Sequence, residues 1–265
     1  MASSTSECDN AASWRPVPQA FRAGDALDPP WEDLFGPLRA GTVDGLVVVG
    51  QIGQSLDGRI ATASGHSHYI NGHEGLLHLH RLRALMDAVV VGIGTALADD
   101  PQLTVRRVEG PHPARVVIDP RGRLPAAARL LACDGADRLV VTTEGTCLAL
   151  PDGVENLACR AQGRHIAPED ILAQLAARGF RRILIEGGAQ TVSRFLAAGC
   201  LDRLHVVVAP LILGAGPAAF DLAPVERVDQ ALRPPIRCHR LGDEMLFDCD
   251  LSAQRKPIGK ANRST

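Results

Sequence analysis

The chain has 265 residues, a formal net charge of −2 and 46% hydrophobic residues, values typical of one large or two small globular domains. Its nearly balanced charge and its 3% of aromatic residues exclude a strongly basic nucleic-acid binder and a stacking platform for single strands. No apolar run approaches the ~18 residues of a membrane span, and Glu7, Asp9 and Arg15 interrupt any apolar core of a secretory signal. We therefore expect a cytoplasmic protein that binds neither nucleic acid nor membrane.

The two ends of the chain differ in composition from its middle. Residues 1–40 are rich in Pro, Ser, Ala and Asp, and we expect a partly disordered N-terminal extension in which WEDLF (31–35) is a candidate docking helix. Residues 253–265 are basic and poor in large apolar side chains, which predicts a disordered tail. Seven single cysteines without a CxxC pair favour buried or reduced thiols over a disulfide framework. The main domain is expected over residues 41–252.

Apolar runs alternate with helical patterns through this domain. Six runs rich in Val, Ile and Leu predict strands covered on both faces, as in a largely parallel sheet; they span 45–52, 87–93, 114–119, 137–143, 181–186 and 202–210. Helices are predicted over 73–85, 168–178 and 188–198. Residues 236–251 predict two strands that turn through Gly242-Asp243. The pattern indicates a three-layer α/β domain with an antiparallel edge.

A strand, two glycines and a helix follow one another at IEGGAQTVSRFL (185–196), an arrangement that suits a phosphate at a helix N-terminus. A plain turn between strand and helix is an equal alternative. Two rival signatures are weaker: Gly92-Ile93-Gly94 lacks the third glycine of the Rossmann fingerprint, and GAGPAA (214–219) contains a proline within the turn. We expect these glycines to shape loops and disfavour a Rossmann domain.

Three polar residues in one compact region could bind a phosphate monoester: Ser67, Arg83 and Arg106. A solvated surface charge is the alternative for each arginine taken alone. In the pair Asp99-Asp100, we favour a functional role for the first residue and helix capping for the second. Glu186 ends a buried strand, where ligand contact and local hydrogen bonding are equally expected.

Histidines at 66, 68, 73, 78 and 80 do not form a convincing metal set, because His78 and His80 lie two residues apart on a helix and point to different sides. We expect surface histidines and no metal site. Neither the HxE and PCxxC motifs of zinc deaminases nor the GxSxG motif of serine hydrolases occurs.

Several segments, in order and spacing, resemble the reductase family of riboflavin biosynthesis over about residues 45–250. They are SLDGRIA, S-x-Y-I, LRA…DAVVVGIGTALADDPQLTVR, RVVID, LIEGG and VAPLILG. The resemblance implies a dihydrofolate-reductase-like fold, a homodimer and NADPH as cofactor. It implies reduction of the ribose of 5-amino-6-(5-phosphoribosylamino)uracil to the ribityl form, without the fused deaminase domain of many bacterial members.

The resemblance also implies roles for individual residues. The phosphorylated substrate would contact Ser67, Arg83, Leu103, Arg106 and Glu186. NADPH would contact Gly53, Tyr69, Thr95, Asp99, a hydroxyl near Thr142, and the run Gly187, Gly188, Ala189, Gln190 and Thr191. Asp99 and Glu186 are the catalytic candidates, and Asp99 would orient the nicotinamide or assist proton transfer. Arg121, Arg123 and Arg164 are unranked candidates for the 2′-phosphate.

Two positions depart from the family pattern. Gln51 stands where bifunctional bacterial enzymes commonly carry Lys, so it is a candidate contact to the pyrimidine, and Tyr69 stands where they carry Trp. A 2,5-diamino-6-(phosphoribosylamino)pyrimidinone, or another pyrimidine- or pteridine-like compound, is therefore an alternative substrate. A non-catalytic homologue that binds a nucleotide or a protein is an alternative of another class.

Overall fold

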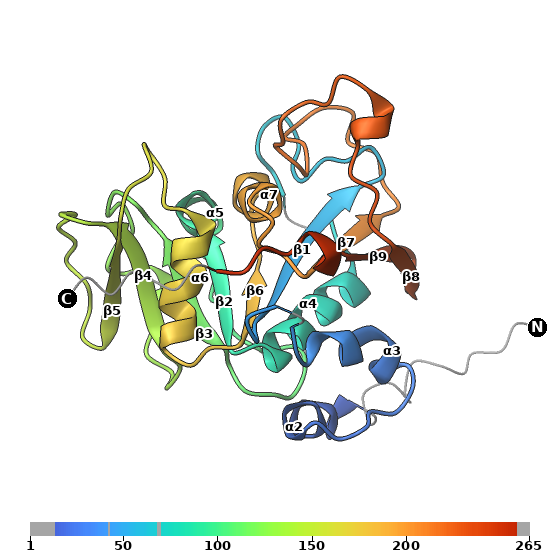
Figure 1. Ribbon diagram of the computed structural model, residues 1–265, viewed down its shortest axis with the longest axis horizontal. Helices are drawn as coiled ribbons and strands as arrows, with labels where there is room; N and C mark the ends of the chain where they lie inside the picture. The colour runs from blue at the N-terminus through green and yellow to red at the C-terminus, as the bar shows by residue number, and fades with distance from the viewer. Residues whose placement is uncertain (1–13, 42, 68–69, 259–265) are drawn as a thin grey trace, which may run out of the picture.

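The computed structural model describes residues 14–41, 43–67 and 70–258 (Figure 1). Its centre is a nine-stranded sheet in the order β5-β4-β3-β2-β6-β1-β7-β9-β8. The strands are β1 (Val47–Ser55), β2 (Ala88–Gly92), β3 (Ala114–Ile118), β4 (Arg138–Thr143), β5 (Val154–Cys159), β6 (Arg182–Ile185), β7 (Arg203–Ala209), β8 (Ile236–Leu241) and β9 (Glu244–Asp250). The first seven are parallel, and β9 pairs antiparallel with both β7 and β8. The predicted α/β class, parallel sheet and antiparallel edge are confirmed.

Helices cover both faces of this sheet. The helices are α2 (Val17–Ala23), α3 (Trp31–Phe35), α4 (His73–Leu85), α5 (Ile93–Asp99), α6 (Pro168–Ala177) and α7 (Ala189–Ala197). Alternate strand residues point to opposite sides: Val47 and Val49 pack with α4 and α5, whereas Leu46 and Val48 pack with α6 and α7. Because each strand is buried on both faces, its sequence is almost continuously apolar.

The N-terminal segment forms an additional cover over α4. Trp14, Phe21, Trp31, Phe35 and Leu38 are at most 3% exposed and belong to the same core cluster as α4. In Figure 1, α2 and α3 lie against α4 on the side away from the sheet. The docking helix expected at 31–35 is confirmed as α3. Helix α2 was not expected from the sequence.

The structure corrects the expectation for two histidines. His78 and His80, expected at the surface, are 0% and 1% exposed, because Phe35 of the N-terminal segment covers His78 and the loop at Arg106 contacts His80. Burial lowers the pKa of His78 well below its usual value, with the positive charges of His205 and Arg81 adding to the effect. The Nε2 atom of His78 lies 3.0 Å from Nδ1 of His205 on β7, and Phe35 stacks on the His78 ring.

Three other segments differ from the sequence-based expectation. Gly92-Ile93-Gly94 begins helix α5 instead of shaping a loop, and Val154–Cys159 adds the edge strand β5. Arg255, expected in a disordered tail, is 6% exposed, because its Nε donates to Asp202 Oδ2 at 3.3 Å inside the fold. The six described cysteines are free thiols, and burial raises the pKa of Cys159 to about 11 and that of Cys200 to about 12.

Candidate cofactor and substrate site

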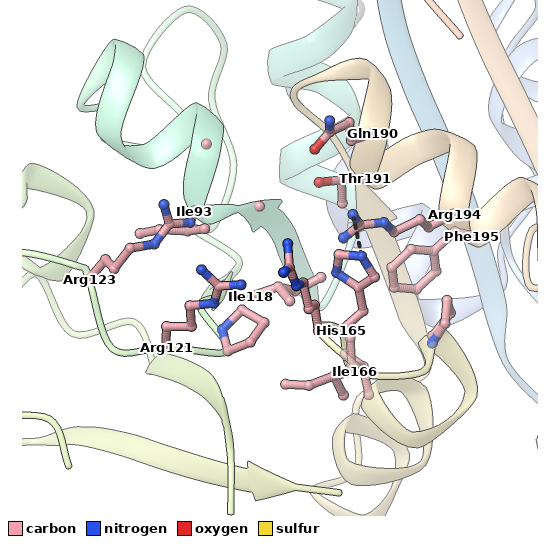
Figure 2. Close-up of a pocket in the computed structure, with 16 residues that line it drawn as sticks. Ile93, Ile118, Arg121, Arg123, His165, Ile166, Gln190, Thr191, Arg194 and Phe195 are labelled. Carbon is pink, nitrogen blue, oxygen red and sulfur yellow. Dashed lines mark hydrogen bonds between the residues drawn. The ribbon is translucent and has the colours of Figure 1, made fainter. Parts of the chain in front are cut away.

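A pocket of about 380 Å³ lies at the carboxyl ends of β2 and β3, where open α/β sheets build their ligand sites. Figure 2 shows Arg121 and Arg123 on one side of this pocket, and Thr191, Arg194 and His165 on the other. Its lining comes from four segments: residues 92–94 at the end of β2, 118–123 at the end of β3 and beyond, 164–171 before and within α6, and 190–195 of α7.

The pocket is strongly cationic. Arg121, Arg123, Arg164 and Arg194 line it, and the part of its lining that the structure describes contains no acidic residue. Arg194 donates from Nη2 to Nε2 of His165 at 3.3 Å. Partial desolvation and the charges of Arg194, Arg121 and Arg164 lower the pKa of His165. An anion such as a phosphate would compensate this excess of positive charge.

The glycine turn before α7 is held by a threonine from α5. The Gly188 N–H donates to Thr95 Oγ1 at 2.8 Å, and Gly187 has a φ of 103° that disfavours any side chain. A Cβ added at Gly92 would lie 2.3 Å from Thr191 Oγ1, so the two segments approach closely only because this residue is glycine. The N-termini of α5 and α7 therefore meet beside the cationic pocket.

A buried ion pair lies on the other side of the same strand ends. Arg83 Nε donates to Glu186 Oε1 at 2.9 Å, and its Nη2 donates to Oε2 at 3.1 Å. The Arg83 and Glu186 side chains are only 8% and 4% exposed. Arg83 also donates from Nη1 to the carbonyl of Thr104 at 3.3 Å, which ties α4 to the loop after α5. Arg83 and Glu186, both predicted to contact the substrate, thus lie side by side, and their role in binding it stays a prediction.

Arg106 lies close to this pair. Its backbone N–H donates to Nδ1 of His80 at 3.1 Å, while its guanidinium makes no hydrogen bond with any described residue. Burial lowers the pKa of Arg106, and the charges of Arg83 and Arg107 lower it further. The same arginines and burial lower the pKa of His80 to about 3. The loop between Asp99 and Arg106 also turns through Leu103, which is buried and has a φ of 57°.

The start of α4 is anchored by a carboxylate from the β8–β9 hairpin. Glu244, which is 4% exposed, accepts from Gly72 N at 3.0 Å, Gly75 N at 2.8 Å and Asn71 Nδ2 at 2.8 Å. Asn71 in turn packs on Gly53, where an added Cβ would lie 1.6 Å from Asn71 Oδ1. Gln51, two residues earlier on β1, is buried. Nothing in the sequence alone singled out Asn71 or Glu244.

The remaining residues predicted to contact a ligand lie around the cationic pocket and the Arg83–Glu186 pair. Asp99 is exposed at the end of α5, whereas Asp100 caps that helix and accepts from Arg129 N at 2.8 Å. Thr142 is buried and donates to Asn156 Oδ1 at 2.8 Å, so its hydroxyl is engaged within the sheet edge. Gln190 and Thr191 line the cationic pocket; Ser67 and Ala189 are half-buried outside its lining. Tyr69 lies outside the described residues.

The sequence reasoning missed Arg194 and His165. Arg194 follows the glycine turn by one and a half helical turns, so the i, i+4 spacing from Gln190 could have placed it on the same face of α7. His165 had no comparable signal. Within residues 14–41, 43–67 and 70–258, no group of three or more His, Cys, Asp or Glu side chains could hold a metal ion. No helix in that part of the chain is long and apolar enough to cross a membrane.

A parallel α/β sheet with a cationic pocket beside a glycine turn, and further arginines near Glu186, defines a domain whose charge suits phosphate-bearing ligands. The sequence profile of the RibD C-terminal domain matches residues 47–243, and the chain belongs to this family. The expected family relationship is confirmed.

Individual relatives agree with this membership. A 2,5-diamino-6-ribosylamino-4(3H)-pyrimidinone 5′-phosphate reductase of Methanothermobacter thermautotrophicus is 37% identical over 206 residues, which cover 73% of this chain and 93% of the relative. The riboflavin biosynthesis protein RibD of Actinobacillus pleuropneumoniae is 30% identical over 202 residues, which cover 73% of this chain and 54% of that protein. The chain therefore spans about half the length of this RibD relative.

Solved structures show the same fold. The deaminase/5-amino-6-(5-phosphoribosylamino)uracil reductase of Thermotoga maritima superposes with a TM-score of 0.68 at 29% identity, over 77% of this chain and 56% of that one. The riboflavin biosynthesis reductase of Saccharomyces cerevisiae superposes with a TM-score of 0.65 over 89% of this chain and 99% of that one. Its 18% identity supports the fold alone.

Proposed function

We propose that this protein is an NADPH-dependent reductase of a phosphoribosylamino-pyrimidine in riboflavin biosynthesis. The observation that carries the proposal is the pocket of four arginines beside the Gly187-Gly188 turn, in a chain of the RibD C-terminal domain family. Its size of about 380 Å³ suits the adenosine end of a dinucleotide, and the arginines suit a phosphate on that end. NADPH is thus favoured over NADH by charge.

The cationic pocket would bind NADPH, and the arginines near Glu186 would bind the substrate. Arg121, Arg123, Arg164 and Arg194 would hold the 2′-phosphate, and the turn tied to Thr95 would face the pyrophosphate. When bound there, NADPH would supply the hydride for C1′ of the ring-opened substrate. No covalent nucleophile of the protein is needed, so its contribution is positioning and charge stabilisation.

The substrate would lie over Arg106 and the Arg83–Glu186 pair. Arg106, whose guanidinium has no hydrogen bond to the described residues, would bind the ribose phosphate next to Arg83 and Ser67. Glu186 would orient the substrate while Arg83 fixes its carboxylate, and the exposed Asp99 would orient the nicotinamide or assist proton transfer. Gln51 would offer the pyrimidine a donor and an acceptor without a charge.

The test is NADPH oxidation by the purified protein, measured side by side with two substrates. The first is 5-amino-6-(5-phosphoribosylamino)uracil. The second is its 2,5-diamino-pyrimidinone counterpart, which is favoured by the name of the Methanothermobacter thermautotrophicus relative, 93% of whose length matches this chain. Turnover with either one, faster with NADPH than with NADH, supports the proposal and identifies the substrate. NADPH binding without turnover of either refutes these substrates. Failure to bind NADPH at all would favour the non-catalytic homologue.

An Arg106→Ala substitution tests the assignment of the substrate phosphate. We expect a large increase in the KM of the substrate with little change in NADPH affinity, because Arg106 lies outside the cationic pocket. Equal weakening of both would contradict the assignment. The resemblance further supports a cytoplasmic homodimer, and light scattering coupled to size-exclusion chromatography would measure the mass in solution.

A further inference from the structure

A second cavity lies on the side of α4 that faces the N-terminal segment. It has a volume of about 1260 Å³ and is bounded by that segment, α4, the loop 106–109 and the β8–β9 hairpin. Residues 81 and 83 of a helix are separated by about 200° around its axis. Arg81 therefore faces this cavity, whereas Arg83 faces the strand ends and Glu186.

Arg81 is buried without a partner. Its side chain is 6% exposed, its Nε is fully covered without a hydrogen bond, and no hydrogen bond or ion pair joins its guanidinium to any described residue. The guanidinium lies over the ring of Trp31 at 4.8 Å and that of Trp14 at 5.7 Å. Burial lowers the pKa of Arg81, an effect that the carboxylate of Glu74 partly offsets. A buried cation with no counter-charge in contact costs free energy, which a bound anion would recover.

The other charged residues that line the cavity are also mostly positive. Five arginines and two glutamates surround the cavity, and Glu109 is already paired with Arg15 at 3.1 Å. Arg107 makes no hydrogen bond to the described residues, and Arg240 uses only its Nε, in a bond to the Gly242 carbonyl at 2.8 Å. Leu34 and Leu77 supply apolar wall. The volume exceeds the ~300–1,000 Å³ of common small-molecule sites, so there is room for more than a simple ion.

We propose that this cavity is a second binding site, distinct from the cationic pocket, for a small organic molecule that bears phosphate. Arg81 contacts the phosphate from the floor, Arg107 and Arg240 contact it from the two rims, and the organic part lies on the leucine wall. The site shares Arg106 with the proposed substrate site, but its contacts through Arg81, Arg107 and Arg240 do not depend on the proposed reductase activity. It needs only the N-terminal segment in place, because that segment supplies Trp14, Trp31 and Leu34.

The chain carries its own reporter, because its only two tryptophans both line this cavity. We would titrate the full-length protein with inorganic pyrophosphate at constant ionic strength, and follow tryptophan fluorescence and calorimetric heat. The expected result is a saturable change in fluorescence. Arg240→Gln, which leaves both indole rings untouched, is expected to weaken the affinity by at least about tenfold, the effect of losing one bond to a charged group. Arg81→Met should weaken it by at least as much in the calorimeter.

Two control variants decide whether the effect is local. Arg178→Gln removes the same charge from the opposite edge of the sheet, where Arg178 pairs with Glu155, and should leave the affinity unchanged. Arg123→Gln alters the cationic pocket and should also leave the fluorescence titration unchanged. Absence of a saturable signal in the unmodified protein, or equal weakening by Arg178→Gln, would overturn the proposal. Neither result would bear on NADPH oxidation, which is measured separately.

Discussion

The Arg83–Glu186 pair offers a sharp test of what holds the site together. Both side chains are more than nine-tenths buried, and two parallel hydrogen bonds of 2.9 and 3.1 Å join them. Removing one partner leaves a buried charge uncompensated, which costs about 3–5 kcal/mol. Since a domain's free energy of unfolding is only about 5–15 kcal/mol, Arg83→Met or Glu186→Leu alone should bring the protein close to unfolding.

The double variant separates the cost of an orphaned charge from the value of the pair. Met and Leu are similar in size to the residues they replace, so Arg83→Met/Glu186→Leu leaves an apolar contact in place of the ion pair. We expect it to be more stable than either single variant, with a coupling free energy of at least about 2 kcal/mol. Urea unfolding followed by circular dichroism measures all four proteins. Single-variant losses below about 1 kcal/mol that simply add would refute the reasoning.

Three further predictions concern charged groups around the site. Binding of 2′-AMP should raise the pKa of His165, measured by NMR, because the phosphate offsets the positive charge of the arginines that lower this pKa. Binding of 5′-AMP should raise the pKa less. The Arg123→Gln substitution should reduce the difference between the effects of the two nucleotides. Glu244→Gln leaves one acceptor oxygen for three N–H donors, so it should lower the free energy of unfolding by about 1–3 kcal/mol. Urea-induced unfolding measures this change, and an unchanged midpoint of the unfolding curve would contradict the anchoring role of Glu244. The fold holds the pKa of His80 near 3 while an unfolded histidine titrates near 6.5, so the unfolded chain takes up the proton first as the pH falls. Stability should therefore fall by about 2 kcal/mol from pH 7 to pH 5, and His80→Asn, which keeps an acceptor for Arg106 N, should flatten that dependence.

The sheet could be predicted because its strands obey a local rule. Runs such as Val47–Val49 and Val89–Val91 are buried on both faces, so every residue is apolar and the run is visible in the sequence. The helix predicted over residues 73–85 is observed with those bounds, His73–Leu85. Such features depend on neighbours in the chain, which a sequence displays directly.

The missed features depend on neighbours far apart in the chain. Strand β5 was not predicted because it lies at the edge of the sheet, where the exposed residues Glu155 and Asn156 interrupt the apolar run that marks the other strands. Helix α5 has only seven residues, and the glycines at its N-cap (Gly92) and in its first turn (Gly94) are typical of a loop. Arg121, Arg123 and Arg164 could be named but not ranked, since only the crossover from β5 through α6 brings the third next to the first two.

The N-terminal segment explains why the surroundings of α4 could not be read from its own sequence. The helix carries His78, His80, Arg81 and Arg83 within six residues, a composition that indicates a solvent-exposed helix. Yet all four side chains are buried, because residues 14–38 cover His78 and Arg81, whereas His80 and Arg83 face the loop at Arg106 and the strand end at Glu186. A polar helix between two apolar layers must satisfy its charges individually. Arg83 does so with Glu186 and His78 with His205, whereas Arg81 has only two indole rings. That asymmetry within one helix is the physical reason to expect an anion beside Arg81.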